Sequence, residues 1–358
     1  MQRYRLLYSV RDLPVFQNRV YNNPFDARNC PKGDVSLVED METGLVKNIA
    51  YESQGQLYDE NYQNEQSYSQ TFRSHLEQVS RIIKKHFTKR NRLIEIGCGK
   101  GYFLELLLAL GFDVIGFDPA YEGSNPRVIK QYFFGGLEKR ADGIILRHVL
   151  EHIPNPLDFL EKLKAENGGA LIYIEVPCFE WICKKRAWFD IYYEHVNYFR
   201  LKDFYRMFDD VLDAGKFFND QYLYVVAKLE SFKRPKRDPL DPIIFPDDFL
   251  SKIRYFSEKI SNDRKNGRKI VIWGASSKGV IFSLLMERMG TPVDIAIDIN
   301  PFKQGKFLPG TGIEVHSPES GINKLPVLSS IYVMNSIYIK EIKEIVGEKI
   351  HLIGVDDE

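Results

Sequence analysis

A glycine-rich turn, EIGCGKG (95–101), constrains the fold of this chain more than any other segment. An apolar strand, RLIEIG (92–97), leads into the turn, and a helix, GYFLELLLALG (101–111), leads out of it. Glycines permit positive φ and let the backbone approach a ligand closely, while the first turn of a helix offers unpaired N–H groups. The segment therefore predicts a strand–turn–helix unit whose turn faces a ligand.

Strand and helix patterns alternate on both sides of this turn. Amphipathic spacing predicts helices at 71–88, 155–165 and 201–208, and short apolar runs predict strands at 112–118, 141–150, 169–177 and 221–229. Alternation of this kind is typical of a doubly wound α/β sheet whose strands are mostly parallel. We therefore expect a Rossmann-like sheet around the glycine turn.

A second α/β unit follows a proline-rich linker. The segment SFKRPKRDPLDPIIFP (231–246) carries four prolines and many charges, which disfavour helix and strand. After an amphipathic helix at 248–266, KIVIWGASSKG (269–279) starts another strand–glycine–helix series. The predicted organisation is an N-terminal module at 1–70, an α/β domain at 71–230, a linker at 231–247 and a C-terminal Rossmann-like domain at 248–358.

The composition excludes several classes of protein. Lys plus Arg and Asp plus Glu both number 49, so no bulk charge attracts nucleic acid or an anionic membrane. The N-terminus lacks the apolar run of a signal peptide, and no stretch of 18 apolar residues predicts a transmembrane helix. The four cysteines form no CxxC pair, which argues against a zinc ribbon or a disulfide framework. We expect a cytoplasmic protein with no nucleic-acid or membrane partner.

The spacing of the glycine turn indicates its ligand. A dinucleotide fingerprint, GxGxxG, requires a third glycine where this chain has Tyr102, so an NAD-dependent enzyme is disfavoured. Glu95 precedes the first glycine by two residues; it would repel a pyrophosphate but suits the cationic aminoacyl end of S-adenosylmethionine (SAM). Asp118 ends the next strand, where an acid can accept hydrogen bonds from both ribose hydroxyls of an adenosine. The predicted SAM-binding residues are Glu95, Gly97, Cys98, Gly99, Gly101, Asp118, Pro119 and His148.

Several motifs together carry a resemblance to a known family. EIGCGKG, FDPAYEG (117–123), RHVLEHI (147–153) and YYEHVNYF (192–199) resemble the SAM-dependent C-methyltransferases of nucleotide-linked deoxysugars. The resemblance continues through WGASSKGV (273–280), IDINPFKQGKFLPGTG (297–312) and VMNSIYIKEI (333–342), and it covers most of residues 10–345. It implies a class I methyltransferase fold with a second, C-terminal Rossmann-like domain, and a nucleotide-linked keto-sugar as substrate.

The resemblance also implies a base-assisted reaction. His195 would remove a proton from a sugar carbon next to a ketone, and Glu194 and Tyr192 would bind or polarise the sugar. The resulting enolate would attack the methyl group of SAM. From the residues alone, His195 and Glu194 could instead be a buried pair that closes a loop.

Two further segments are predicted to complete the active site. His148 follows a buried strand, and ligands of open α/β sheets bind beyond the carboxyl ends of strands, so we expect it to contact SAM or substrate. His152 lies four residues further on, where we expect it to help close the loop. In the resembling family a tyrosine-rich segment covers the active site; Tyr62 matches the tyrosine that assists catalysis, and Tyr58 and Tyr68 belong to the same segment. A solvated connector is the alternative.

The N-terminal module departs from the resembling family, which usually carries a zinc site of four cysteines there. The segment DMETG (40–44) stands where the second CxxCG pair would fall, with Asp40 and Thr43 in the cysteine positions, and the earlier pair is missing too. Because thiolates dominate such sites, we expect no metal.

The C-terminal unit is expected, by resemblance, to hold the nucleotide diphosphate of the sugar. Its turn runs from Gly274 to Gly279 at the start of a helix, where backbone N–H groups can cradle a phosphate and Lys278 adds positive charge. It is not a P-loop, because Val280 replaces the required Ser or Thr. The predicted substrate-binding residues are Gly274, Ser276, Lys278, Gly279, Asn300 and Lys303. A scaffold domain that binds nothing is the alternative.

Three functions remain open at this point. The first is methylation of a nucleotide-linked sugar, at carbon, for a surface polysaccharide or a glycosylated metabolite. The second keeps SAM but transfers the methyl group to a sugar oxygen or nitrogen, acceptors that also need a base. The third is a protein that binds SAM or a nucleotide-sugar without turnover.

Overall fold

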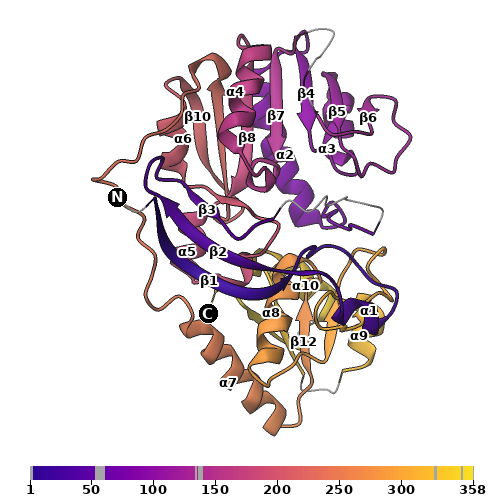
Figure 1. Ribbon diagram of the computed structural model, residues 1–358. Coiled ribbons are helices and arrows are strands. Elements are labelled where there is room, and N and C mark those ends of the chain that lie inside the picture. Colours follow the sequence, from indigo (N-terminus) through magenta and orange to yellow (C-terminus); the bar gives the residue numbers. More distant parts are fainter. Residues whose placement is uncertain are drawn as a thin grey trace.

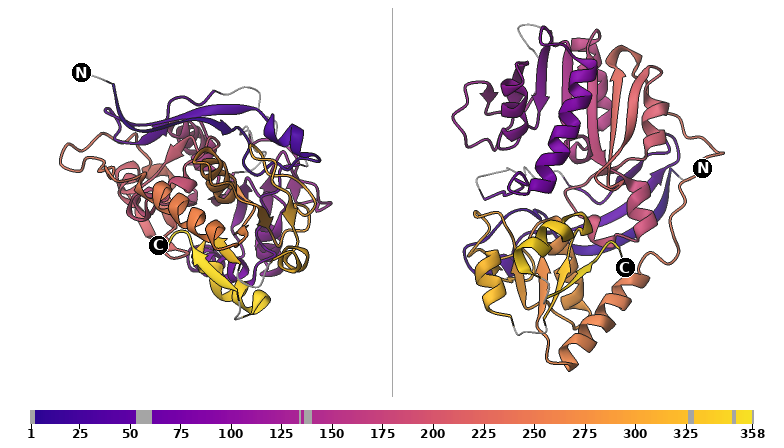
Figure 2. Two further views of the ribbon diagram at one scale, coloured as in Figure 1. Left: turned by 90° about the horizontal axis from the view of Figure 1, so that it is seen from below. Right: turned by 180° about the vertical axis from the view of Figure 1, so that it is seen from behind.

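The computed structural model describes residues 3–52, 61–133, 135, 140–325, 329–347 and 350–357. Its strands form three sheets, of seven, five and four strands. Figure 1 shows the seven-stranded unit at the top and the C-terminal unit below it. The N-terminal strands β1 (Tyr4–Pro14) and β2 (Lys32–Asp40) run along the junction of the two units, as the rear view in Figure 2 also shows.

The larger unit is built on the seven-stranded sheet. Its strands, in spatial order, are β10 (Val211–Phe217), β11 (Tyr222–Lys228), β8 (Leu171–Pro177), β7 (Gly143–Arg147), β4 (Arg92–Ile96), β5 (Asp113–Phe117) and β6 (Val128–Ile129). Strands β8 to β6 are parallel, while β11 runs antiparallel to both β8 and β10. The predicted doubly wound, mostly parallel sheet is confirmed. The chain moves outward from β4 to β6 and then returns to β7, so the strand order reverses between β4 and β7, which is where such sheets bind ligands.

The helices of this unit follow the predicted pattern with one omission. They are α2 (Gln70–His86), α3 (Tyr102–Ala109), α4 (Pro156–Asn167), α5 (Phe179–Lys185) and α6 (Leu201–Met207). Helix α2 begins at Ser69, whose hydroxyl accepts a hydrogen bond from the N–H of Phe72, and it buries Leu76, Val79 and Ile83 against the sheet. Helix α5 was not predicted, because seven residues span less than two turns and show no clear period.

The C-terminal unit is a second parallel sheet covered by helices. Its strands, in spatial order, are β14 (Val315–His316), β13 (Ile295–Ile297), β12 (Ile270–Trp273), β15 (Ser330–Val333) and β16 (His351–Gly354). Its helices are α7 (Ser251–Lys265), α8 (Ser277–Arg288), α9 (Pro318–Asn323) and α10 (Ile339–Val346). Helix α8 is buried on nearly all sides, because Trp188 of the larger unit stacks on Phe282 with ring centroids 5.6 Å apart. The predicted second Rossmann-like unit is therefore confirmed and packs directly on the first.

The N-terminal segment forms a four-stranded antiparallel sheet. It contains β1, β2 and β3 (Val46–Asn48), and its fourth strand, β9 (Asn197–Tyr198), comes from the YYEHVNYF segment. A short helix, α1 (Pro24–Arg28), follows β1 and pairs with the C-terminal unit through Arg28 and Glu287. The N-terminal sheet thus ties the segment predicted to be catalytic to both α/β units.

Protein groups hold the DMETG turn of the N-terminal sheet. Asp40 accepts hydrogen bonds from the N–H groups of Glu42 (3.0 Å) and Thr43 (3.3 Å), and its other oxygen pairs with Lys47 at 2.8 Å. Although burial opposes the shift, these contacts hold the pKa of Asp40 below its usual value. Within the described ranges, no helix is long and apolar enough to cross a membrane.

Candidate active site

The glycine turn after β4 is the first component of the site. Gly97 adopts φ of 73°, and a Cβ atom there would lie 2.4 Å from Cγ2 of Val149. Gly101, with φ of 84°, begins α3. Both positions therefore require glycine. The turn joins β4 to α3, as the sequence predicted, and it lies at the reversal of strand order.

Asp118 closes this turn from the end of β5. Its two carboxylate oxygens accept the N–H groups of Gly99 and Ala120, each at 2.8 Å. The side chain is half-buried, and burial raises its pKa against the pull of these two N–H groups. Each carboxylate oxygen accepts more than one hydrogen bond, so Asp118 keeps the capacity to bind ribose hydroxyls.

Glu95 supplies the negative charge expected beside the cofactor. It is only 1% exposed, and its Oε2 atom has no hydrogen-bond partner in the described part of the chain. Burial raises its pKa to about 7, despite the opposing charge of Arg147. A buried carboxylate with an unsatisfied oxygen at this turn suits a cationic ligand group such as the aminoacyl end of SAM.

A buried carboxylate that the sequence analysis missed organises the neighbouring strand end. Glu175 of β8 is fully buried, and its Oε1 atom lies 2.9 Å from Nε2 of His75 and 3.1 Å from Nε2 of His148, while Tyr173 donates to Oε2 at 2.7 Å. Burial opposes ionisation, but His75 and Arg147 outweigh it and hold the pKa of Glu175 well below its usual range. The only sequence signal was one acid inside the otherwise apolar run LIYIEVP (171–177).

His148 lies at the end of β7 in an unusual backbone conformation. Its φ is 53°, and its N–H donates to the carbonyl of Glu175 at 2.8 Å. Its ring nitrogens lie beside two carboxylates, with Nδ1 3.4 Å from Glu151 and Nε2 beside Glu175. Burial opposes protonation, but these carboxylates raise the pKa of His148 to about 9. The two carboxylates therefore favour the protonated form of His148.

His195 of the YYEH segment has the opposite pKa shift to His148. The Tyr192 hydroxyl lies 2.6 Å from Nε2 of His195, whose side chain is 3% exposed. Burial holds the pKa of His195 well below its usual value, and the nearby His152 and His148 lower it further. His195 is therefore a neutral imidazole that can accept a proton.

Three further predicted residues lie around His195. The ring of His152 is 4.9 Å from that of His195, and its Nδ1 atom lies 2.9 Å from the carbonyl of Glu194. The carboxylate of Glu194 accepts the N–H of Gln17 at 2.8 Å. Burial and the charge of Glu194 raise the pKa of Tyr62, so this tyrosine is close to the same carboxylate. Tyr58 lies outside the described residues.

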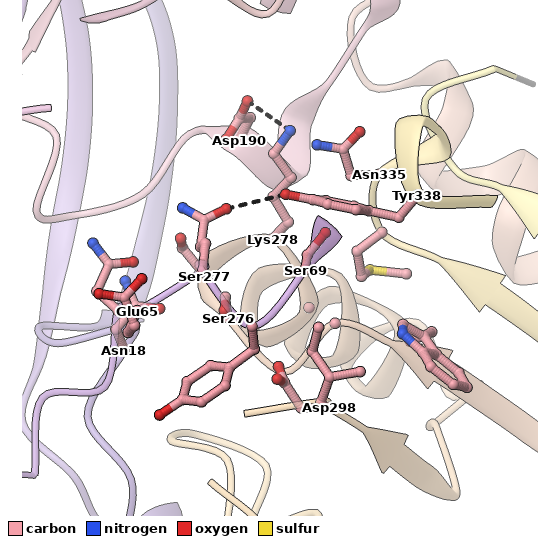
Figure 3. Close-up of a pocket in the computed structure, with 18 of the residues that line it drawn as sticks. Asn18, Glu65, Ser69, Asp190, Ser276, Ser277, Lys278, Asp298, Asn335 and Tyr338 are labelled. Atoms are coloured by element: carbon pink, nitrogen blue, oxygen red, sulfur yellow. Dashed lines mark hydrogen bonds and ion pairs between the residues drawn. The ribbon is translucent and has the colours of Figure 1, made fainter. Parts of the chain in front are cut away.

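A cavity between the two α/β units brings these groups together. The predicted residues that line it are Tyr62, Tyr68, His148, His152, Tyr192 and His195, with Gly274, Ser276, Lys278 and Gly279 on the opposite side. Residues of the SAM turn do not line this cavity, and His148 is the predicted SAM-contacting residue that does. Figure 3 shows residues of both units facing this space.

Lys278 joins the two units across the cavity. Its ammonium lies 3.3 Å from Asp190 and donates to Gln221 at 2.7 Å, and it stands 4.7 Å from the ring centre of Trp181. The contact with Asp190 is visible in Figure 3. Lys278 therefore lines the predicted substrate site but already pairs with an acid there.

The other predicted residues of the C-terminal unit support the turn from behind. A Cβ atom on Gly279 would lie 2.0 Å from the carbonyl oxygen of Gly274, so Gly279 permits the close approach of helix and turn. Lys303 is 2% exposed; its ammonium donates to the carbonyl of Ala275 at 3.1 Å and lies 3.7 Å from Asp298. Like Lys303, Asn300 does not line the cavity.

Comparison with known proteins identifies both units. A model described as a methyltransferase domain matches residues 67–211, and one described as a C-methyltransferase C-terminal domain matches residues 248–344. The C-methyltransferase NovU of Streptomyces niveus is 24% identical over 279 residues. The chain therefore contains a methyltransferase domain followed by a C-methyltransferase C-terminal domain.

The similarity to NovU is distant and partial. The aligned region covers 67% of this chain and 65% of NovU, which is less than two thirds of that protein. The family resemblance and the SAM cofactor that the motifs predicted are nevertheless confirmed.

Solved structures resemble the methyltransferase domain only loosely. A SAM-dependent methyltransferase from Archaeoglobus fulgidus is 19% identical, with a TM-score of 0.35, and covers 45% of this chain and 98% of its own. A 1,6-didemethyltoxoflavin-N1-methyltransferase from Burkholderia thailandensis is 15% identical, with a TM-score of 0.33, and covers 54% and 96% respectively. Likeness at this level says nothing about the acceptor of this methyltransferase.

Proposed function

We propose that this methyltransferase transfers the methyl group of SAM to a carbon atom of a nucleotide-linked keto-sugar. The observation that carries the proposal is the cavity between the two units, which brings a neutral, buried His195 opposite the turn that begins α8. A carbon acceptor needs a base to form its nucleophile, and a nucleotide-linked sugar needs a second binding region for its diphosphate. The cavity offers a group suited to each task.

In the proposed reaction, His195 removes a proton from the carbon next to the ketone. The electron pair of the broken C–H bond forms the enolate, whose carbon attacks the methyl group of SAM and displaces S-adenosylhomocysteine. The Tyr192 hydroxyl, 2.6 Å from Nε2 of His195, orients the imidazole. The SAM cofactor supplies an activated methyl group on a sulfonium, and Glu95 and Asp118 would hold its aminoacyl and ribose ends.

The protonated His148 would contribute to stabilising the enolate. Its imidazolium lines the cavity and is held between the carboxylates of Glu151 and Glu175. A fixed positive charge near a developing negative charge lowers the barrier without reorganisation. Tyr62 would bind the sugar from the N-terminal side of the cavity, and Glu194, which does not line the cavity, would act through its contact with Tyr62.

The turn after β12 would hold the diphosphate. The N-terminus of α8, with Ser276, Lys278 and Gly279, lines the cavity, and a helix start attracts anions. Lys278 would exchange part of its contact with Asp190 for phosphate oxygens. Lys303 and Asn300 would act by supporting the turn.

A screen of nucleotide-linked keto-sugars with methyl-labelled SAM tests the proposal. We expect label in one sugar nucleotide, and NMR of the product to show a new carbon–carbon bond. A product that carries the new methyl group on a sugar oxygen or nitrogen would show that the reaction is O- or N-methylation instead. SAM binding without turnover of any sugar would contradict an enzymatic role for this cavity.

Substitution of His195 by Ala tests the base. We expect turnover to fall by about 100-fold to 10,000-fold, the usual contribution of general-base catalysis, with SAM affinity nearly unchanged. The matched control is His86→Ala: His86 pairs with Asp213 of β10 at 3.0 Å and does not line the cavity. Full activity of the His195 variant would remove this residue as the base.

A further inference from the structure

Glu151 is a buried carboxylate that the proposed reaction uses only through its contact with His148. It is 1% exposed, lines the cavity, and neither of its oxygens has a hydrogen-bond partner among the described residues. Its one charged neighbour is His148, whose Nδ1 atom lies 3.4 Å from Oε1. Buried polar groups are almost always hydrogen-bonded, and leaving one unsatisfied is costly. A carboxylate in this state indicates a ligand that donates to it.

The backbone around Glu151 fixes its side chain at the cavity. Glu151 belongs to a single 3₁₀ turn, η1 (Leu150–His152), which follows β7 at the reversal of strand order. The carbonyl of Glu151 accepts the N–H of Val196 at 2.8 Å, and Asn197 donates to the carbonyl of Ile153 at 2.7 Å. These hydrogen bonds connect the η1 turn to the YYEH segment and fix the backbone from which the Glu151 carboxylate extends.

Glu151 also lies beside the proposed base. Ligand atoms of Glu151, His152 and His195 all lie within 4.8 Å of one another. One acceptor molecule can therefore contact Glu151 and present a nearby C–H bond to His195. An ionised carboxylate only accepts hydrogen bonds, so the acceptor must present a donor there.

We propose that Glu151 is an acceptor-binding residue, whose carboxylate accepts a hydrogen bond from a hydroxyl group next to the reacting carbon. This inference rests on the proposed function, because a sugar carries hydroxyl groups on the carbons next to its ketone. Glu151 would thus select acceptors that have this hydroxyl and align the C–H bond with His195. A divalent metal is a less suitable ligand, because the His148 imidazolium at 3.4 Å would repel a second cation.

The test combines the variant Glu151→Gln with a matched pair of acceptors. The two acceptors are the keto-sugar nucleotide found by the screen and its analogue without the hydroxyl next to the reacting carbon. Wild type should show a KM at least about tenfold higher for the analogue, because a hydrogen bond to a charged group is lost. The variant should raise the KM of the hydroxylated sugar by a similar factor and no longer distinguish the two sugars. Its kcat should fall as well, because His148 loses one of the two carboxylates that favour its protonated form.

A buried glutamate elsewhere provides the matched control. Glu39 is also 1% exposed, but Arg5 and Arg237 donate to it at 2.8 and 2.7 Å, and it does not line the cavity. Glu39→Gln should lower Tm and leave the KM of the acceptor unchanged. Glu151→Gln should also lower Tm, because the His148 imidazolium loses a carboxylate 3.4 Å away, so the KM of the acceptor is the measurement that distinguishes the two variants.

Four results would overturn the proposal. A fall in kcat with unchanged KM would move Glu151 into the chemical step, and an equal KM increase for both sugars would deny the contact with the hydroxyl. A lower Tm with unchanged kinetics would make the residue structural. Stoichiometric Co²⁺ binding to wild type, seen by visible absorption and abolished in the variant, would make it a metal ligand.

The inference about Glu151 can be separated from the proposed function. Calorimetric binding of the two sugar nucleotides, with S-adenosylhomocysteine present, needs no turnover. Binding of both sugars without preference would overturn the role of Glu151 while leaving the proposed reaction intact. Binding of neither sugar would contradict the proposed function and this inference with it.

Discussion

In the turn after β4 and in the turn after β12, an aspartate accepts hydrogen bonds from the backbone. The buried side chains next to the two turns, however, differ in charge. Asp118 accepts the N–H of Gly99, and Asp298 accepts the N–H of Ala275, both at 2.8 Å. Each aspartate also accepts, at 2.8 Å, the N–H of the residue two positions further along the chain. The backbone of the two turns therefore follows one design, with an acid at the end of the next strand.

The buried side chains behind the turns carry opposite charges. At the first turn, Glu95 is buried with an unsatisfied oxygen, and the turn carries a net negative charge with Asp118. At the second turn, Lys303 is buried against Asp298 and the carbonyl of Ala275, and it compensates the acid. The comparison teaches that one buried side chain can decide whether such a turn suits a cationic ligand or an anionic one.

The largest expected effect comes from removing the compensating charge at the second turn. Lys303→Met leaves Asp298 buried without its cation, and breaking a buried pair in this way costs about 3–5 kcal/mol of the free energy of unfolding. Denaturant unfolding followed by circular dichroism measures the loss. SAM affinity should be unchanged, because the first turn is untouched.

Lys306→Met is the matched control for this prediction. Lys306 lies three residues away, is more exposed, and donates to Asn22 at 2.5 Å. Its loss should cost less than about 1 kcal/mol, the usual range for partly exposed polar contacts. Equal losses for both variants would mean that Lys303 does not act by neutralising Asp298.

Removal of each aspartate should separate the two turns by ligand. Asp118→Ala should weaken SAM binding by about 10-fold to 100-fold, because hydrogen bonds between a charged carboxylate, the ribose and the turn are lost. Asp298→Ala should leave SAM affinity unchanged and weaken binding of a nucleotide-sugar. Isothermal titration calorimetry with SAM measures both variants, and equal affinities would contradict the assignment of the first turn to SAM.

The smallest expected effect is the pH dependence of SAM affinity. Burial raises the pKa of Glu95 to about 7. Because this pKa is higher in the folded protein than in the unfolded chain, protonated Glu95 favours the folded state. This contribution to the free energy of unfolding is fully present below about pH 4.5 and is lost as the pH rises through about 7. Binding of the cationic end of SAM has the opposite preference, because it requires the carboxylate.

SAM affinity should therefore rise with pH. The ionised fraction of Glu95 increases about tenfold between pH 6 and pH 8, so SAM affinity should rise by up to about tenfold over this range. Glu95→Gln should remove this dependence. A pH dependence that persists in the variant would come from the amino group of SAM or another residue, and would contradict the role of Glu95.

The sequence predicted those parts of the site that short segments encode. The turn at Gly97 needs glycine because of positive φ, and the period of α2 follows from its buried face, so both are readable from neighbouring residues. Sequence patterns did not reveal the roles of Glu175 and Glu151. Glu175 is one acid in an apolar strand and Glu151 is one acid in a histidine motif, and neighbouring residues do not show which side chains either acid contacts. Their partners come from other elements, such as α2 for Glu175 and the YYEH segment for the turn of Glu151.

The sequence by itself determined two strand–glycine–helix units, the acid after the second strand of the first unit and the resemblance to methyltransferases. These features depend on backbone conformation and spacing within about thirty residues. Only the tertiary structure decided that His148 is a cation while His195 is neutral, because carboxylates surround the first and burial among other imidazoles governs the second. Only the packing of the two sheets could place Lys278 beside Asp190 and form the cavity between them, since those contacts join segments far apart in the chain.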